Sequence, residues 1–498
     1  MEELRKMDKY DVWEVVTRTK DMRILRAKWV FTRKIDGSTG LPSTFKARWV
    51  AKGFHQIEGV DFNEIFSSVA HKDSIRVFLA LVNYLDLECD QVDIVAAFLN
   101  GELKEVIFME PPEGSDIPAG SVLRLKKSLY GLKQSPRCFN VALDEYLKSE
   151  GFAPSQADPC LYTFNDGNDF MMLAVHVDDQ LIASNNRSTL DAFKKRLNQR
   201  FECKDQGPVS YFLGINVVRD RETRKLSISQ EHYLEGLLRK FDMDKSHGSR
   251  IALPTTFKPV PATDAEFEEA RHLDYPQIVG SVMYAATISR PDLAYPAGVL
   301  ARFIGKWSLS HYKAAKHLLR YIRGTTDLCL TFDAEAGKRI ILGYADADWG
   351  GCLDTRRSTT GYLFKTFGGL VAWKSRRQPT VALSTAEAEI MASVDAAKQA
   401  VWLKRLLSDL NISLDGPVEI FNDNMGAIQL SQHPGSHDRT KHIDMRHLWL
   451  RERVADETVK MQYIPTNDNV ADTLTKSLPI VKSEPFAVAL GLRRVPLL

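Results

Sequence analysis

Two adjacent aspartates, Asp178 and Asp179, interrupt a run of apolar residues at 173–182. Because apolar residues flank the pair on both sides, the pattern predicts the tight turn of a hairpin between two buried strands. Neighbouring carboxylates repel each other, and a fold keeps them most readily when a divalent cation neutralises them. A third aspartate, Asp93, also follows a strand-like run. Three such carboxylates predict a two-metal site for phosphoryl transfer. The alternative is a solvated turn, since aspartate is common in turns.

A second set of carboxylates lies near the C-terminus, each at the end or edge of an expected element: Asp346, Glu389, Asp423 and Asp472. The glutamate is ambiguous. Ser384 followed three residues later by Glu387 is a capping box, which is a structural task at the start of a helix. Glu387 and Glu389 are two residues apart on that helix, so they point to different faces. Asp348 is a second candidate beside Asp346, because strand alternation would put both on one face.

The elements that must position these carboxylates form a mixed α/β pattern. Residues 22–56 predict a two-stranded finger with a loop at 36–40, and residues 170–183 predict the hairpin that carries the aspartate pair. Residues 251–270 contain three prolines and predict a linker. The remaining expected elements are helices at 73–85, 136–150 and 188–201, mostly helical structure at 271–323, and from about 338 three strands, then helix, strand, helix, strand and a last helix holding Asp472.

Composition bounds the class of protein. A chain of 498 residues with 44% hydrophobic and 26% charged residues is expected to form two or three globular domains. The net charge of +2 means that nucleic acid would have to be bound by local basic patches. Six scattered cysteines without a Cys-x-x-Cys pair favour a reducing compartment. Without a membrane-spanning run or a signal-peptide core, we expect a soluble intracellular protein.

Four ordered motifs closely resemble the reverse transcriptase of copia-type LTR retrotransposons, and the resemblance runs from about residue 29 to residue 476. They are residues 46–53 (KARWVAKG), 93–101 (DIVAAFLNG), 128–137 (SLYGLKQSPR) and 177–179 (VDD). Four further motifs resemble ribonuclease H, which cuts the RNA strand of an RNA–DNA hybrid. They are residues 343–346 (GYAD), 389–392 (EIMA), 421–424 (FNDN) and 469–472 (NVAD).

The first resemblance implies roles at a polymerase site. Asp93, Asp178 and Asp179 would hold two Mg²⁺ ions, with Mn²⁺ as an alternative. Phe98 stands where reverse transcriptases place an aromatic gate against a 2′-hydroxyl; the alternative is an ordinary core phenylalanine. Lys46 and Arg48 could reach the triphosphate, although a solvated strand face is the commoner fate of such charges. Residues 131–136, with Lys133 and Gln134, would shape the floor under the templating base. One residue departs from the family pattern: His176 stands where an aromatic residue, often tyrosine, is usual.

The second resemblance implies two Mg²⁺ ions held by Asp346, Glu389, Asp423 and Asp472, and it favours Glu389 over Glu387 and Asp346 over Asp348. Many ribonucleases H carry a histidine in the loop before the last helix, but residues 465–469 contain none. His437, His442 and His447 could be read as zinc ligands, but no cysteine accompanies them, so this reading is disfavoured.

Basic clusters could form a track for the hybrid, although each alone is more often a solvated face. The best cluster is residues 374–378, with Lys374, Arg376 and Arg377 close to the second site in the expected fold. The other clusters are Lys126, Lys127, Lys133 and Arg137, and Lys194, Lys195, Arg196 and Arg200.

The resemblance implies an α/β (α+β) chain with four parts. Residues 1–248 would form polymerase fingers and palm with the start of the thumb, residues 249–335 a linker and helical thumb or connector, residues 336–480 a ribonuclease H-like domain, and residues 481–498 a C-terminal tail. Since modules for nucleocapsid, protease and integrase are missing, we expect part of a longer polyprotein or a truncated reading frame.

The implied function is RNA-directed DNA synthesis followed by RNA degradation. The implied partners are an RNA template, a DNA primer, the RNA–DNA hybrid and dNTPs, together with the integrase and Gag parts of the same element, and no membrane. The implied location is the cytoplasm, including virus-like particles, with entry into the nucleus. The rival hypothesis is a decayed or domesticated element that only binds nucleic acid.

Overall fold

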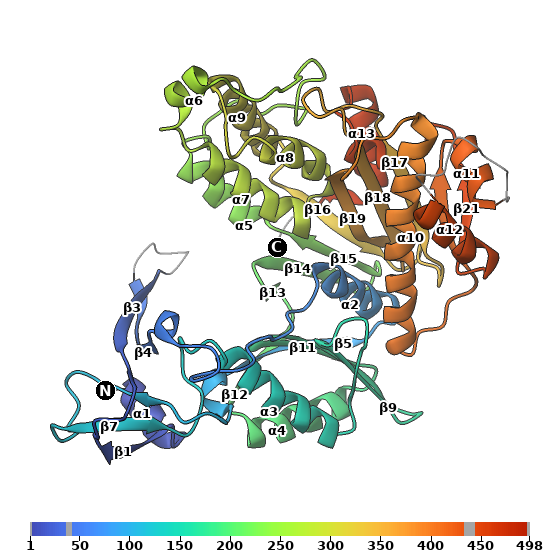
Figure 1. The fold of residues 1–498 in the computed structure, drawn as a ribbon. Helices are drawn as coiled ribbons and strands as arrows, with labels where there is room; N and C mark the ends of the chain where they lie inside the picture. Colours follow the sequence, from blue (N-terminus) through green and yellow to red (C-terminus); the bar gives the residue numbers. More distant parts are fainter. Residues whose placement is uncertain (1, 36–41, 433–443, 496–498) are drawn as a thin grey trace. The chain divides into compact units, whose positions relative to one another are not determined.

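The computed structural model describes residues 2–35, 42–432 and 444–495 (Figure 1). The chain forms two compact units that interleave along the sequence. Unit 1 comprises residues 1–70, 90–155 and 159–207, and unit 2 comprises residues 71–89, 156–158 and 208–498. No helix in the described part of the chain is both long and apolar enough to cross a lipid bilayer.

Unit 1 is centred on a six-stranded sheet in the order β12-β5-β11-β10-β9-β8. Its core contains Leu173 and Ile182 from the central strands, Phe139 from helix α3, and Phe193 and Leu197 from helix α4. The sequence predictions for both helices and for the hairpin are confirmed to within about two residues. The bounds are β5 Glu88–Ile94, α3 Ser135–Ser149, β8 Ala153–Pro154, β9 Leu161–Asn165, β10 Phe170–His176, β11 Asp179–Ser184, α4 Arg187–Arg200 and β12 Cys203–Pro208.

The predicted finger is an antiparallel pair, β3 (Ala27–Ile35) and β4 (Pro42–Ala51), in which Trp29 lies opposite Trp49. The loop predicted at 36–40 lies outside the described residues. The other elements of this part are helix α1 (Glu2–Lys9) and a four-stranded sheet of β1 (Trp13–Thr17), β7 (Ser121–Leu125), β6 (Phe108–Met109) and β2 (Ile24–Leu25).

Unit 2 begins with helix α2 (Lys72–Tyr84), close to the predicted 73–85, and contains a helical cluster. Part of the predicted linker at 251–270 is wrong, because residues 264–270 form helix α6. The Thr263 side chain accepts a hydrogen bond from the amide of Glu266, and the Glu266 carboxylate accepts one from the amide of Thr263, which stabilises the start of that helix. The cluster comprises α5 Glu231–Lys240, α6 Asp264–Ala270, α7 Tyr275–Ile288, α8 Ala294–Ala301 and α9 Leu309–Arg323.

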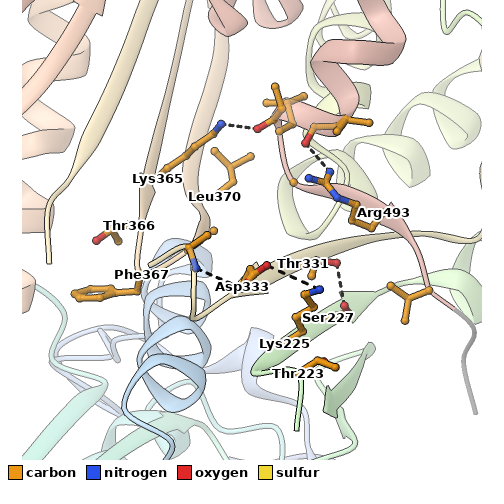
Figure 2. Close-up of a pocket in the computed structure, with 18 of the residues that line it drawn as sticks. Thr223, Lys225, Ser227, Thr331, Asp333, Lys365, Thr366, Phe367, Leu370 and Arg493 are labelled. Atoms are coloured by element: carbon orange, nitrogen blue, oxygen red, sulfur yellow. Dashed lines mark hydrogen bonds and ion pairs between the residues drawn. The ribbon is translucent and has the colours of Figure 1, made fainter. Parts of the chain in front are cut away.

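A five-stranded sheet in unit 2 has the order β13-β14-β15-β16-β22. A cavity of about 690 Å³ lies beside it and is lined in part by Lys225, Asp333, Lys365 and Arg493 (Figure 2). The Lys365 ammonium donates a hydrogen bond to the carbonyl of Ala489. The bounds are β13 Tyr211–Phe212, β14 Ile215–Asp220, β15 Lys225–Ser229, β16 Leu328–Asp333, α13 Ile480–Ala489 and β22 Leu492–Arg494.

The last sheet has the order β19-β18-β17-β20-β21. Strands β17 to β19 are antiparallel, whereas β20 pairs in parallel with both β17 and β21. The bounds are β17 Leu342–Ala347, β18 Thr359–Thr366, β19 Gly369–Arg377, α10 Thr385–Asp409, β20 Val418–Asn422, α11 Met425–Gln432, α12 Asp444–Ala455 and β21 Val459–Tyr463.

The prediction of a full helix that holds Asp472 is wrong. Residues 470–474 form only a short 3₁₀ helix, η4 (Val470–Leu474), and α13 is a separate helix. The Asn469 side chain accepts a hydrogen bond from the amide of Ala471 at the start of η4. η4 ends at Leu474, and Pro479 precedes the first residue of α13.

Two candidate carboxylate sites

The first site is built on the β10–β11 hairpin of unit 1. Asp178 occupies the turn, Asp179 begins β11 opposite His176, and Asp93 is the next-to-last residue of β5. The amide of Ile94 donates a 2.9 Å hydrogen bond to the carbonyl of Asp178, which ties the turn to β5. Val177 has a φ of 58°. This left-handed conformation is rare for a β-branched residue, and such strain collects at functional sites.

The carboxylates of this site repel one another. Burial, together with the neighbouring Asp178 and Asp93, raises the pKa of Asp179, while a hydrogen bond from Gln91 and the proximity of His176 oppose that rise. A bound divalent cation would favour the charged form of all three carboxyls. The donor set therefore suits Mg²⁺, which prefers carboxylate oxygens.

A cavity of about 700 Å³ opens in front of these carboxylates. The predicted substrate residues Lys46 and Arg48 line it with Asp93, Asp178 and Asp179. Sequence reasoning missed Tyr130, which also lines it and lies under the Arg48 guanidinium at 5.2 Å from the ring centroid. The only feature of the sequence that could have identified Tyr130 is its position within the 128–137 motif. The other lining residues include Trp29, Phe31, Phe45, Lys6, Lys204 and Gln206.

Four predicted substrate residues do not line this cavity. The Phe98 ring packs against the core beneath the six-stranded sheet and edge-on against Tyr130, with centroids 5.2 Å apart. The buried amide of Gln134 donates to the carbonyl of Asp61 at 2.9 Å, and the Lys133 ammonium lies 4.6 Å from the Phe62 ring centroid. Both residues thus brace the segment that follows β4. The described residues that line the cavity do not include Lys133, Gln134, Phe98 or His176.

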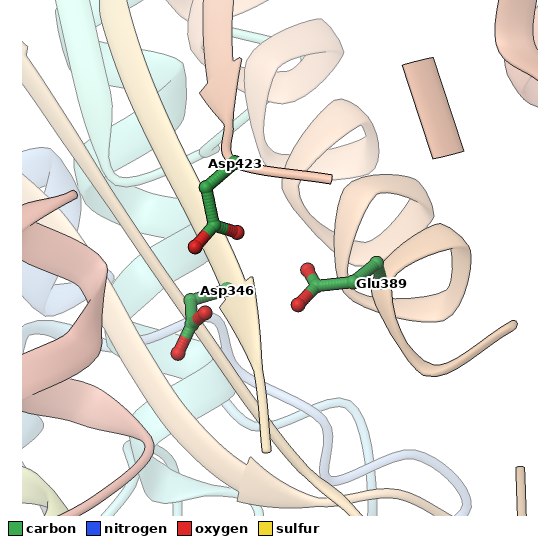
Figure 3. Close-up of side chains that lie close together, drawn as sticks. All are labelled: Asp346, Glu389 and Asp423. Carbon is green, nitrogen blue, oxygen red and sulfur yellow. The ribbon is translucent and has the colours of Figure 1, made fainter. Parts of the chain in front are cut away.

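The second site brings three carboxylates of unit 2 together. Asp346 lies on β17, Asp423 directly follows the parallel neighbour β20, and Glu389 lies near the start of α10, which packs on this sheet (Figure 3). One oxygen atom from each lies within 4.8 Å of the others. All three carboxylates belong to described residues. The geometry and the donor set fit a divalent cation.

Short polar side chains hold the second site in place, and sequence reasoning missed them. The Asn422 amide donates to the Glu389 carboxylate at 2.9 Å, and the Thr475 hydroxyl donates to the Asp346 carboxylate. The Asn469 amide donates to the carbonyl of Ala345 at 3.0 Å, next to Asp346. Their signal in the sequence was adjacency to the motif carboxylates.

Burial makes the second site a poor environment for uncompensated negative charge. Burial and the nearby Asp472 and Asp423 raise the pKa of Asp346 to about 7, although Lys476 and the Thr475 hydrogen bond oppose the rise. The pKa of Glu389 lies well above its ordinary value because of burial and the proximity of Asp346. A cation bound among these oxygens would offset the repulsion.

The competing carboxylates have backbone partners instead. Glu387 accepts a 2.7 Å hydrogen bond from the amide of Leu383, and its own amide donates to the Ser384 hydroxyl at 3.1 Å. The helix cap is therefore formed, although the glutamate reaches one residue further back than in a capping box. Asp348 accepts a hydrogen bond from the amide of Thr359.

The remaining predicted residues fall into three situations. Asp472 is fully buried and lies outside the group of three. Lys374 is exposed, and Arg376 forms a 2.5 Å ion pair with Asp395. The ring of His447 lies within hydrogen-bond distance of the carbonyl of Leu430, while His437 and His442 lie outside the described residues.

Comparison with known proteins places the chain among retrotransposon proteins. Residues 10–255 match the family described as "Reverse transcriptase (RNA-dependent DNA polymerase)". The chain is 43% identical over 97% of its length to the retrovirus-related Pol polyprotein from transposon TNT 1-94 of Nicotiana tabacum, covering 37% of that protein. It is 35% identical over 95% of its length to the corresponding polyprotein from transposon RE1 of Arabidopsis thaliana, covering 32% of it. The chain thus spans about a third of these relatives.

Among solved structures, LC11-RNase H1, isolated from compost, matches 28% of this chain and 94% of its own chain at 15% identity and a TM-score of 0.23.

Proposed function

Because the chain belongs to the copia-type retrotransposon Pol polyproteins, as a reverse transcriptase portion, we propose that it copies RNA into DNA and then cleaves the RNA strand of the hybrid. One observation carries the proposal: within the family match, Asp93, Asp178 and Asp179 share one cavity with Lys46 and Arg48. Two carboxylates on a tight turn and one on the adjacent strand, facing two cations, suit a triphosphate and the metal ions that accompany it.

At the first site Asp93, Asp178 and Asp179 would hold two Mg²⁺ ions, with Mn²⁺ as an alternative. When bound, such ions activate the primer 3′-hydroxyl and offset charge on the leaving pyrophosphate. Arg48 and Lys46 would bind the triphosphate, Arg48 through paired hydrogen bonds. Tyr130, stacked under Arg48, would hold that guanidinium toward the cavity.

At the second site Asp346, Glu389 and Asp423 would hold the metal, with Asp472 as a fourth carboxylate. Bound metal would supply an activated water and neutralise charge on the scissile phosphate. Asn422 keeps Glu389 aimed at the other two carboxylates, and Thr475 does the same for Asp346. The exposed Lys374 and the partly buried Arg377, on strand β19 of the same sheet, would contact phosphates of the hybrid.

The proposed substrates are an RNA template, a DNA primer, dNTPs and the RNA–DNA hybrid. In the element's life cycle the chain would act beside its integrase and Gag parts, in the cytoplasm and in particles, with later entry into the nucleus.

The test is Mg²⁺-dependent extension of a DNA primer on an RNA template, measured beside cleavage of an RNA–DNA hybrid. Asp178→Asn should abolish extension and spare cleavage, whereas Asp423→Asn should do the reverse. Asp415→Asn, a change of the same kind outside both sites, is the control and should alter neither rate.

Each failure has a separate meaning. No extension by the wild-type chain would refute the polymerase activity and favour the rival, an element that binds nucleic acid without copying it. Equal rates in wild type and variants would refute the site assignments. The presence of all seven expected carboxylates favours the enzyme over the rival.

A further inference from the structure

The fourth carboxylate of the second site is held by two lysines. Asp472 is fully buried, and its two oxygens form ion pairs with Lys476 at 2.6 Å and with Lys482 at 2.5 Å. A buried carboxylate with neither a metal nor a cationic partner would be strongly destabilising. In the free protein these lysines supply the compensating charge.

The two lysines differ in what else they approach. The Lys476 ammonium also lies 4.0 Å from an oxygen of Asp346, so it lies between Asp472 and Asp346. On its other side Asp346 meets Glu389 and Asp423. The Lys482 ammonium, from α13, reaches Asp472 and the carbonyl of Thr466. Only Lys476 therefore bridges the fourth carboxylate and the group of three.

We propose that the ammonium of Lys476 takes the place of a second divalent ion in the protein free of nucleic acid. The resting second site then holds one ion among Asp346, Glu389 and Asp423, while Asp472 is kept in place by lysine. This inference rests on the proposed ribonuclease H function and deepens it. The Lys476 side chain is 43% exposed, so it can swing into solvent when a substrate phosphate brings a second ion.

The test counts Mn²⁺ ions bound to the full chain, by electron paramagnetic resonance in a titration without nucleic acid. All proteins carry Asp178→Asn and Asp179→Asn, so that the affinity of the first site for Mn²⁺ is lowered equally in every variant. The parent should bind one ion at the second site, and Lys476→Met should bind two. Lys476→Arg, which keeps the charge, should bind one.

Lys482→Met is the matched control, because it removes a lysine from the same carboxylate without opening the space beside Asp346. It should still bind one ion, and circular dichroism would show that each variant folds. Two ions in the parent would overturn the proposal, as would one ion in Lys476→Met or an equal gain in Lys482→Met. Failure of the parent to bind any ion, or a count unchanged by Asp423→Asn, would instead refute the metal site of the proposed function.

Discussion

At the scale of the residue, backbone strain and buried charge mark two positions where a substitution should change the stability of the fold. Val177 stores backbone strain beside Asp178, and Lys365 keeps a positive charge in a half-buried position. The sequence marks neither residue as unusual. The φ angle of Val177 and the burial of Lys365 both depend on how the rest of the chain folds around these residues.

Val177→Gly should raise stability by about 1 kcal/mol, because glycine relieves left-handed strain of about 1–3 kcal/mol but loses more chain entropy on folding. Primer extension should slow, since the turn that aims Asp178 becomes looser. Thermal unfolding and extension rate check the two effects. Glu457→Gly, at an exposed position with a φ of 57°, should stabilise the chain without slowing extension. A lower stability of Val177→Gly would show that the turn is unstrained.

Lys365→Met should stabilise the protein at neutral pH. Burial and the nearby Arg493 lower the pKa of Lys365 from 10.5 to about 8. Between pH 8 and 10.5 the unfolded chain therefore binds more protons at this group than the native chain, so its contribution to stability rises with pH. The gain from removing it should be at most about 3 kcal/mol at pH 7 and vanish near pH 10.5.

Urea unfolding of Lys365→Met and wild type at a series of pH values checks this prediction. Lys374→Met removes an exposed lysine from the neighbouring strand and should show no such trend. A difference that stays constant with pH would mean that the charge of Lys365 carries no penalty.

At the scale of the element, one glycine decides how the 128–137 motif meets the finger. Gly131 has a φ of 94°, and the amide of Ala51 donates a 2.9 Å hydrogen bond to the carbonyl of Tyr130. A Cβ on Gly131 would lie 2.2 Å from the carbonyl oxygen of Ala51. The end of β4 and the motif can therefore approach this closely only with glycine at 131.

Gly131→Ala should cost about 3 kcal/mol or more, because strain and overlap with backbone atoms add. Gly120→Ala, with a φ of 84° and nothing within 4 Å of the added Cβ, should cost only about 1 kcal/mol. Urea unfolding of the two variants separates crowding from strain, and equal losses would contradict the close approach.

Periodic elements could be predicted and irregular ones could not. The β10–β11 hairpin and helices α3 and α4 carry their pattern in the local sequence, so their bounds were predicted within about two residues. Helix α6 lies among prolines and acidic residues, which predict a linker, and the sequence around η4 predicts a full helix. The side chain of Thr263 caps α6 and that of Asn469 caps η4, and such local contacts override average propensity.

At the scale of the molecule, each of the two compact units is assembled from segments that are not continuous in the sequence. Helix α2 comes from the region predicted as palm, yet it belongs to unit 2. Its buried Arg76 donates to the carbonyls of Val371, Thr287 and Ile288 at 2.7–2.9 Å and stacks 3.8 Å from the Trp373 ring centroid. The predicted domain boundaries at 248 and 335 remain predictions.

A fragment of residues 208–498 should therefore fail to fold on its own, because it leaves buried carbonyls without donors and apolar surface uncovered. Addition of a peptide of residues 71–89 should restore a cooperative thermal transition by circular dichroism. The same peptide with Arg76→Met is the matched control and should restore much less. Cooperative unfolding of the fragment alone would contradict the role of α2.

By itself the sequence predicted the carboxylates of both candidate sites and the order of the elements that carry them, because carboxylate positions and strand periodicity are written in local residue types. Tertiary structure alone decided that Tyr130 rather than Phe98 lines the first cavity, and that oxygens of Asp346, Glu389 and Asp423 lie within 4.8 Å of one another. It also decided that Lys476 lies between Asp346 and Asp472. These outcomes depend on packing between segments far apart in the chain, which no local pattern records.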